Sequence, residues 1–521
     1  MATASRPARK ETIRIGGAAL LAALVSLFLF SPRFFFWREM EIPLLPAMPP
    51  EVARAKFAVM QLKHPFMRMD NHISLVLQWR LFFPLLGYAL SLPPLVYLAL
   101  PPLGCWLVLV YIMAVLRRHE IGWPDCLAVA ILTATCSWFF VSTGWLAYFD
   151  SWWVLGLLVF VFSRPRLAAI AVLITPWIDE RFVITLPLAA MLRREYSATV
   201  SNEYRVGGRE LGWLGILLAP WLLVRVGCFL FARDQATSDY IRDTVGQGGF
   251  AIKYYFLGLW QGIRCAWVFV GIWLGLCSQR SRWEKTGLVV IFLFTLIFNL
   301  IVAEDISRSV SILVPMILMG IILYKIHSPG RLRPVLFAAC ALNLLLPAAH
   351  VAGNGVTAIR HFYAVLQEGH PDEDLMAYYY NEMAVMYFQR NRPQDALQMV
   401  DLAIRRDPGR IEAHANRAAI YVALGQVREA LSDADYIVAR RPGSPDAWFD
   451  RGILRIKNDD LGGAAADFER AMRCAPPGWA RQSVTQSILK QLHAKTSSEE
   501  QAPRPAGKNS GQEGNLSGSR P

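Results

Sequence analysis

Residues 95–116 read LVYLALPPLGCWLVLVYIMAVL, an apolar run that contains no charged side chain. A helix of about 20 apolar residues is long enough to cross the roughly 30 Å hydrocarbon core of a bilayer. Arg117 and Arg118 follow directly, and basic residues at the end of such a run mark the cytoplasmic side. The run therefore predicts a membrane-spanning helix, and the rest of the chain is interpreted outward from it.

Similar apolar runs occur on both sides of this one, and 54% of all residues are hydrophobic. Residues 81–92 are apolar but too short to cross, and Pro93 and Pro94 end them, which predicts a helix at the interface or only part-way into the bilayer. Together the runs predict an all-α polytopic membrane domain over 15–350, after a cytoplasmic segment 1–14. It would hold about nine to twelve membrane helices, some short or re-entrant. The other candidate spans are 15–36, 126–142, 150–163, 211–231, 254–277, 287–303, 309–325 and 334–350.

The charged residues indicate how the chain crosses. Residues 167–192 are apolar except for Asp179, Glu180 and Arg181. In one straight helix these charges would lie at the bilayer midplane, where each costs about 2.5–3.5 kcal/mol. We expect instead a hairpin of two short helices with the three residues at its tip. With a cytoplasmic N-terminus, this hairpin places every basic loop on the cytoplasmic side, as the positive-inside rule requires.

In this orientation five segments open on the non-cytoplasmic side and bring ionisable residues to one membrane surface. They are the loop 37–80, the turn 143–150, the hairpin tip, the loop 232–253 and the turn 303–308. The formal net charge of +13 comes mainly from short basic loops, so no nucleic-acid partner is predicted. The eight cysteines show no CxxC pair and no metal-ligand spacing, and no metal site is predicted from them.

Two of these outer residues each allow a functional and a structural interpretation. Arg80 precedes the short apolar segment 81–92, where its planar guanidinium could hold a lipid phosphate or act as an anchor whose charge reaches the interface. Asp150 begins an apolar run after 145–149, where it could take part in a site or cap a helix N-terminus.

Two further groups are open to the same choice. Asp179, Glu180 and Arg181 lie between two apolar halves, where ionisable residues are usually functional, although a mutual ion pair could simply fasten the hairpin. Asp305 and Arg308 are one helical turn apart and fit either an N-cap with an ion pair or a phosphate and hydroxyl site. On one face, the acidic residues could deprotonate a hydroxyl while the arginines neutralise a leaving phosphate. No Walker, HExxH, GxSxG or Rossmann motif is present.

The C-terminal part repeats with a period of 34 residues. Proline recurs at Pro408, Pro442 and Pro476, alanine at 396, 430 and 464, and a small residue at 384, 418 and 452. This pattern resembles tetratricopeptide repeats (TPRs), which stack pairs of antiparallel helices into an α-solenoid. It predicts units at 377–410, 411–444 and 445–478 and a capping helix within 372–495, followed by a disordered tail at 496–521. The groove of such an array implies a protein or peptide partner, although the repeats could instead pack only on their own membrane domain.

The membrane half resembles the GT-C class of integral membrane glycosyltransferases. In that class an acidic residue of the first outer loop acts as base, and the donor is a sugar linked to polyprenyl phosphate. For this chain a divalent metal is left open as a cofactor. Carried over to this chain, Asp70 would be the base, with Glu39 and Glu41 as rivals and Asp179 and Glu180 as further catalytic candidates. The donor-phosphate ligands would be Arg80, Arg181 and Arg308; His72, Asp150 and Asp305 are further substrate-binding candidates. The motifs that carry the resemblance are WRLFFPLL at 79–86, FDS at 149–151, DERF at 179–182 before Pro187, and DISR at 305–308 before Pro315.

The resemblance covers roughly residues 15–350 and departs from the class at 38–41, where Arg-Glu-Met-Glu stands after the first span instead of an aspartate. It implies a multi-pass protein of a bacterial inner (plasma) membrane that contacts membrane lipid and a lipid-linked sugar. Because the last span exits on the non-cytoplasmic face, we expect the repeats there, in the periplasm. Two other functions remain open: a non-catalytic scaffold that works through its repeats, and a polysaccharide polymerase or ligase or a transporter of lipid-linked glycans.

Overall fold

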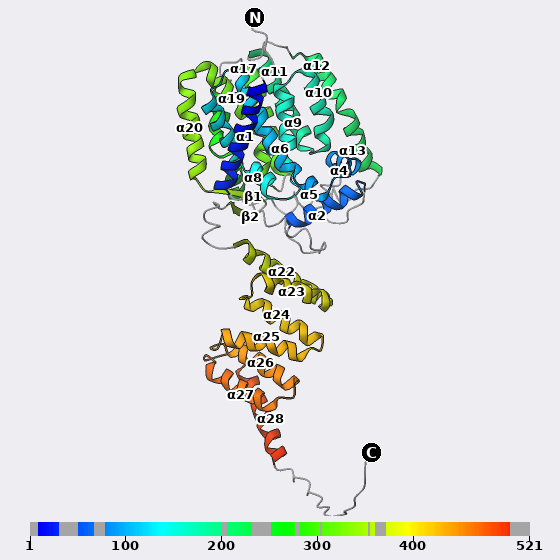
Figure 1. The fold of residues 1–521 in the computed structure, drawn as a ribbon, viewed down its shortest axis with the longest axis vertical. Helices are drawn as coiled ribbons and strands as arrows, with labels where there is room; N and C mark the ends of the chain where they lie inside the picture. Colours follow the sequence, from blue (N-terminus) through cyan, green and yellow to red (C-terminus); the bar gives the residue numbers. More distant parts are fainter. Residues whose placement is uncertain are drawn as a thin grey trace, which may run out of the picture. The chain divides into compact units, whose positions relative to one another are not determined.

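The computed structural model describes residues 9–30, 50–66, 79–199, 206–231, 252–276, 282–302, 305–352, 355–359 and 371–500. The chain forms two compact units, Met1–Asp372 and Glu373–Pro521, and each is described here by itself. The first is a bundle of apolar helices and the second is a helical repeat array (Figure 1). The predicted all-α fold, a multi-helix membrane-type domain followed by TPR repeats, is confirmed.

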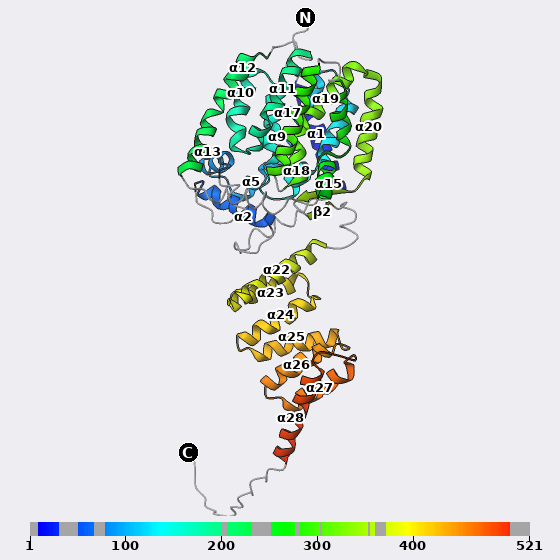
Figure 2. The ribbon, with the colours of Figure 1, turned by 180° about the vertical axis from the view of Figure 1, so that it is seen from behind.

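The first unit consists of short and medium-length helices that follow one another closely. Views from opposite sides place α2, α5 and the β-hairpin at one end of this unit, and α12 and the beginning of the chain at the other (Figures 1 and 2). Its helices are α1 (Arg9–Leu29), α2 (Pro50–Lys63), α4 (Phe82–Ala89), α5 (Pro94–Leu98), α6 (Leu100–Arg118), α7 (Trp123–Ala134), α8 (Ser137–Gly144), α9 (Asp150–Phe162), α10 (Pro165–Ile174), η2 (Thr175–Trp177), α11 (Arg181–Thr199), α12 (Gly208–Leu217), α13 (Ala219–Phe231), α15 (Ile252–Ile263), η3 (Arg264–Ala266), α16 (Trp267–Leu276), α17 (Arg282–Val302), α18 (Ile306–Ser309), η5 (Val310–Leu313), α19 (Val314–His327) and α20 (Pro329–Leu345).

Within the described ranges, four helical stretches are long and apolar enough to cross a membrane: Arg9–Leu29, Pro94–Arg118, Lys253–Leu276 and Ile306–His327. Helices α7 and α8 pass the same test together but are bent by 71° at the break between them. Other predicted spans are shorter apolar helices, among them Asp150–Phe162 (α9) and Thr286–Leu300 of α17. The unit therefore combines full-length and short apolar helices, as the sequence predicts, and is not a set of spans of equal length.

Residues 165–199 form the hairpin that the sequence predicts. At the start of α9 and α11, Arg181 Nη2 lies 2.5 Å from Asp150 Oδ1. Further along both helices, Arg193 Nη1 donates to the carbonyl oxygens of Phe160 and Ser163 at 2.6 and 2.7 Å. Helices α9 and α11 therefore run in the same direction, and α10 between them runs back. Asp179, in the turn that follows η2, is buried. This turn is therefore packed inside the unit and does not project from it.

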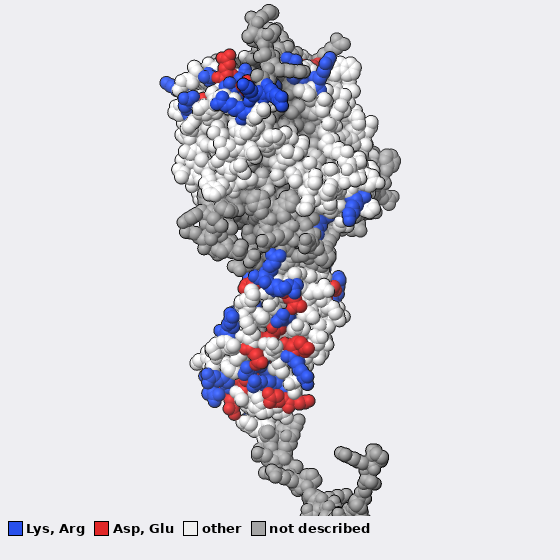
Figure 3. Space-filling model, viewed as in Figure 1, with Lys and Arg blue, Asp and Glu red and all other residues white. Residues whose placement is uncertain are grey.

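Side chains inside and outside the bundle differ as expected for a membrane domain. Trp138, Trp153 and Trp273 are fully buried in its interior. Apolar side chains on the outer helices are widely exposed, for example Leu223 of α13 and Phe294 of α17. On the face that Figure 3 shows, Lys and Arg gather at the end of the unit where the chain begins, and a broad band without charges follows. A band of this kind suits contact with lipid, since soluble proteins rarely expose such large apolar surfaces.

One small β-hairpin interrupts the helical fold and corrects the predicted span at 334–350. Helix α20 ends at Leu345, and β1 (Ala348–Ala352) then pairs antiparallel with β2 (Gly355–Ile359). His350 lies opposite Thr357 in this pairing. Pro347 accounts for the change, because its ring fixes φ and it has no N–H to continue the helix.

The second unit contains three helix pairs and a final helix. In the last pair a glycine lets the two helices approach closely: a side chain added at Gly452 would lie 2.9 Å from the ring of Phe468. Helices α23, α25 and α27 end 34 residues apart, each just before a repeated proline. The helices are α22 (Pro371–Gln389), α23 (Pro393–Arg406), α24 (Ile411–Ala423), α25 (Val427–Arg440), α26 (Pro445–Lys457), α27 (Leu461–Cys474) and α28 (Gln482–Glu500).

Candidate functional site

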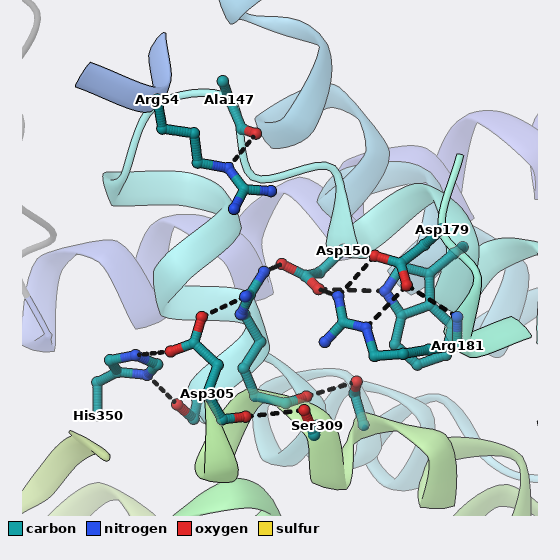
Figure 4. Close-up of polar contacts among 12 residues, drawn as sticks. Arg54, Ala147, Asp150, Asp179, Arg181, Asp305, Ser309 and His350 are labelled. Atoms are coloured by element: carbon teal, nitrogen blue, oxygen red, sulfur yellow. Dashed lines mark hydrogen bonds and ion pairs between the residues drawn. The ribbon is translucent and has the colours of Figure 1, made fainter. Parts of the chain in front are cut away.

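Predicted site residues from distant parts of the sequence meet in one buried cluster, at the end of the helical unit where α2, α5 and the β-hairpin lie (Figures 1 and 4). The cluster draws on the segment before α4, the start of α9, the hairpin turn and the start of α18. Its charged members at the predicted positions are Arg80, Asp150, Asp179, Glu180, Arg181, Asp305 and Arg308.

Asp150 is the centre of this cluster. Its carboxylate is 1% exposed and bridges two guanidinium groups: Oδ1 lies 2.5 Å from Arg181 Nη2, and Oδ2 lies 2.7 Å from Arg308 Nη1. Trp153 Nε1, one turn along α9, also donates to Oδ1 at 3.1 Å. As the first residue of α9, the Asp150 carboxylate is also stabilised by the partial positive charge of the unpaired N–H groups at the helix N-terminus. Asp150 therefore joins α9, α11 and α18 into one structure.

The hairpin turn binds the segment that precedes α4. Asp179 accepts hydrogen bonds from Arg181 Nε at 2.8 Å and pairs with Arg80 Nη1 at 2.9 Å. Arg80 also donates to Glu180 at 2.7 and 3.2 Å, in the two-bond geometry typical of guanidinium and carboxylate. Burial would raise the pKa of Asp179, but the positive charges of Arg181 and Arg80 outweigh it and hold that pKa well below its usual range. Glu180 is the more accessible carboxylate, since 26% of its side chain is exposed.

A second branch of the cluster links α18 to β1. Asp305 pairs with Arg308 and accepts a hydrogen bond at 2.7 Å from His350 Nε2 when that nitrogen carries the proton. The other ring nitrogen of His350 lies 3.1 Å from Ser137 Oγ and 3.0 Å from Ser307 Oγ. Ser137, Ser307 and His350 are all buried, so this Ser-His-Asp arrangement holds β1 in place and offers no accessible nucleophile.

Arg54 of α2 is the fourth guanidinium at this end of the unit. Its Nε donates to the carbonyl oxygen of Ala147 at 3.1 Å, and its guanidinium lies 4.0 Å from the ring centroid of Tyr148. The Arg308 guanidinium lies 4.6 Å from the same ring. Figure 4 shows the terminal nitrogens of Arg54 directed toward the cluster. Among the described residues, Arg54 pairs with no carboxylate.

Some predicted site residues lie outside the described ranges: Asp70 and His72, and the rival acidic residues Glu39 and Glu41. Conversely, sequence reasoning missed Arg54 and His350. A histidine at the end of an apolar run was a usable signal for His350, since ionisable residues in such runs are rarely incidental. Arg54 gave no such signal, because it lies in a mixed polar and apolar segment. Within the described part of the chain, no three His, Cys, Asp or Glu side chains are grouped so that they could hold a metal ion.

The described chain is thus an all-α protein in which helices apolar enough to span a membrane precede a helical repeat array. Residues 416–478 match the tetratricopeptide repeat family, so the predicted repeats are confirmed there. No curated protein matches the chain.

Three solved structures to which the chain is similar are small TPR proteins or domains. The chaperone SycD of Yersinia enterocolitica is 16% identical, with 27% of this chain and 94% of SycD covered and a TM-score of 0.24. The TPR domain of Sgt2 from Aspergillus fumigatus is 21% identical, with 28% and 91% covered and a TM-score of 0.23. The first TPR domain of human RPAP3 is 24% identical, with 25% and 98% covered and a TM-score of 0.22.

Proposed function

We propose that this chain is a GT-C-like glycosyltransferase of a bacterial inner membrane, which transfers a sugar from a polyprenyl-phosphate donor to an acceptor hydroxyl on the non-cytoplasmic face. The observation that carries the proposal is the convergence of ionisable residues from four distant segments on one buried cluster at one end of an apolar helical unit. Buried charges are costly in such a unit and are usually retained for a function.

The orientation rests on the distribution of basic residues. Lys and Arg gather at the end of the unit where the chain begins, which the positive-inside rule assigns to the cytoplasm. The cluster lies at the other end, so we assign it to the non-cytoplasmic face. Helix α20 leads into β1, and His350 of β1 is bonded to the cluster. The chain therefore leaves the helical unit on that face, and we place the repeats in the periplasm.

The reaction needs a base, a donor site and stabilisation of the leaving phosphate. On the basis of the resemblance we assign Asp70 as the base. It would remove the proton of the acceptor hydroxyl while the hydroxyl oxygen attacks the anomeric carbon of the donor sugar. Glu180 is a second acidic candidate because part of its side chain is accessible. Asp179 would act through Arg80, which it holds together with Glu180. The guanidinium groups would stabilise the negative charge of the leaving polyprenyl phosphate.

The remaining predicted ligands would bind the donor around this centre. One side of the site would be formed by a network of ion pairs among Arg181, Arg308, Asp150 and Asp305. His72 would contribute a donor-binding side chain from the first outer loop. A divalent metal remains compatible with the proposal.

The repeats are proposed to bind a protein or peptide that brings the acceptor to the membrane unit. The basis is the TPR match over 416–478, because stacked repeats form an extended concave surface suited to peptides. Ion pairs within and between the repeats stabilise this surface: Arg417 pairs with Asp433 of its own repeat at 2.8 Å and with Asp401 of the preceding repeat at 2.9 Å. Arg451 repeats the same two contacts one unit later, with Asp467 and Asp435.

Substitution of the two candidate acids tests the enzymatic proposal. Asp70→Asn and Glu180→Gln are expressed in cells that lack the native chain, and surface glycans are compared by mass spectrometry. We expect loss of a glycan with the amount of folded protein unchanged. Asp125→Asn serves as the control, because Asp125 pairs with Arg333 away from the cluster. Unchanged glycans with both acid variants, together with full loss after deletion of 372–495, would reject the enzyme in favour of a TPR scaffold.

A further inference from the structure

Arg54 differs from the other three guanidinium groups of the cluster. Arg80, Arg181 and Arg308 each contact two carboxylates. The Arg54 side chain belongs to a residue that is only 8% exposed, and its one hydrogen bond runs from Nε to a backbone carbonyl. Its two terminal nitrogens have no hydrogen-bond partner among the described residues. Arg308 Nε is a fully buried donor without a partner in the described part of the chain.

This arrangement is unfavourable without an anion. A buried cation that lacks an ion pair costs several kcal/mol unless it is compensated. Burial lowers the pKa of Arg54 to about 10, and the neighbouring Arg308 and Arg80 act in the same direction, whereas Tyr148 and Asp150 oppose them. Stacking on Tyr148 recovers part of the cost, but Arg308 shares the same ring. Arg54 and Arg308, each with an unpaired donor, thus both contact the ring of Tyr148.

We propose that Arg54, with Arg308 and the ring of Tyr148, binds the phosphate of a lipid that enters the cluster from the membrane. A guanidinium offers two parallel hydrogen bonds to a phosphoryl group, which matches the free terminal nitrogens of Arg54. This inference rests on the proposed function for the role of the lipid, and it changes the ligand assignment. Arg80 and Arg181, which the resemblance makes phosphate ligands, are occupied by carboxylates and instead shape the site.

An apolar groove supports a lipid over a free phosphate as the source of this anion. It has a volume of about 460 Å³ and lies between α1 and α6, lined by Leu20, Leu24 and Trp106 among others, with Phe139 and Thr143 of α8 in its wall. Helix α8 ends one residue after Thr143, and the chain continues to Ala147, the residue whose carbonyl holds Arg54. The groove wall at Thr143 and the residue that holds Arg54 are thus four positions apart in the chain.

Binding of farnesyl phosphate to the full-length protein in detergent tests the inference, with farnesol and inorganic phosphate as matched probes. We compare the wild type with Arg54→Met, which keeps the length of the side chain and removes its charge, and with Arg54→Lys. Loss of a charge-assisted pair is expected to weaken farnesyl phosphate binding about ten-fold or more in Arg54→Met, and less in Arg54→Lys. Lys63→Gln is the control, because Lys63 is an exposed charge at the end of the same helix.

The outcomes separate the interpretations. Tight binding of farnesyl phosphate and weak binding of both other probes supports a lipid phosphate site, whereas equal binding of inorganic phosphate overturns the lipid part. Wild-type affinity in Arg54→Met overturns the site itself. The unfolding midpoint without ligand is the folding check: a phosphate ligand predicts no lower midpoint for Arg54→Met, and a purely structural Arg54 predicts a lower one. If glycans are unaffected by Asp70→Asn and Glu180→Gln but binding depends on Arg54, the enzyme proposal fails and this site stands.

Discussion

Replacing Asp150 by Asn is the sharpest perturbation of the cluster. The side chain keeps its size, but the negative charge between Arg181 and Arg308 is lost. Each guanidinium keeps one other carboxylate, so the change removes two charge-assisted hydrogen bonds, at about 1.5–3 kcal/mol each. The amide oxygen can still accept one weaker bond. Because the site is buried, we expect the free energy of unfolding to fall by about 3–5 kcal/mol.

Asp125→Asn is the matched control for this experiment. It also breaks an Arg–Asp pair of the helical unit, with distances of 2.9 and 3.2 Å, but 62% of the Arg333 side chain is exposed. An exposed pair of this kind contributes about 1 kcal/mol or less. Unfolding of both variants is followed by circular dichroism in mixed micelles of increasing SDS fraction. If Asp150→Asn is destabilised no more than Asp125→Asn, the buried cluster does not hold α9, α11 and α18 together.

Three further predictions concern other parts of the chain. Because the pKa of Asp179 is depressed in the folded state, its contribution to stability is complete at neutral pH and is lost as the pH falls below about 4; the unfolding midpoint measured against pH should decrease there, and less so in Asp179→Asn. Gly320→Ala should cost about 1–3 kcal/mol, because the added carbon would lie 2.1 Å from a backbone oxygen of α16, whereas Gly271→Ala, with open space around it, should be neutral or slightly stabilising in the same denaturation. Arg417→Met should speed hydrogen exchange in α24 and α25 of the full chain, since it leaves the buried Asp433 without its bidentate partner. Arg441→Met breaks only the exposed pair with Glu412, so its backbone amides should exchange at the wild-type rate.

The hairpin at 165–199 shows how much of the site was accessible from sequence. Its turn at Asp179 and Glu180 was predicted because three adjacent charges cannot lie at the middle of one straight membrane helix at acceptable cost. That argument fixes where the chain turns back. It does not give the partners of the turn, and the pairing of Asp179 with Arg80 and of Arg181 with Asp150 depends on how α4, α9 and α11 pack.

The sequence alone did not give the surroundings of individual charged residues, as Asp150 and Arg54 show. Asp150, considered alone, fitted an N-cap; in the structure Phe149 is the N-cap residue, and Asp150 is the first residue of α9 and bridges two arginines. Arg54 carried no sequence signal, because an arginine in a mixed segment is ordinarily exposed. Its burial follows from the position of α2 against Ala147 and Tyr148, which no local pattern encodes.

By itself, the sequence determined which segments are helical, which are apolar enough to leave water, and where the 34-residue repeats lie. Hydropathy and repeat period are local properties: each helix satisfies its own backbone hydrogen bonds, and each repeat contacts mainly its neighbours. Only the tertiary structure decided which charges neutralise one another and which cation is left without a partner. The ion pair between Asp150 and Arg308, which lie 158 positions apart in the chain, depends on the packing of whole helices and not on the composition of any segment.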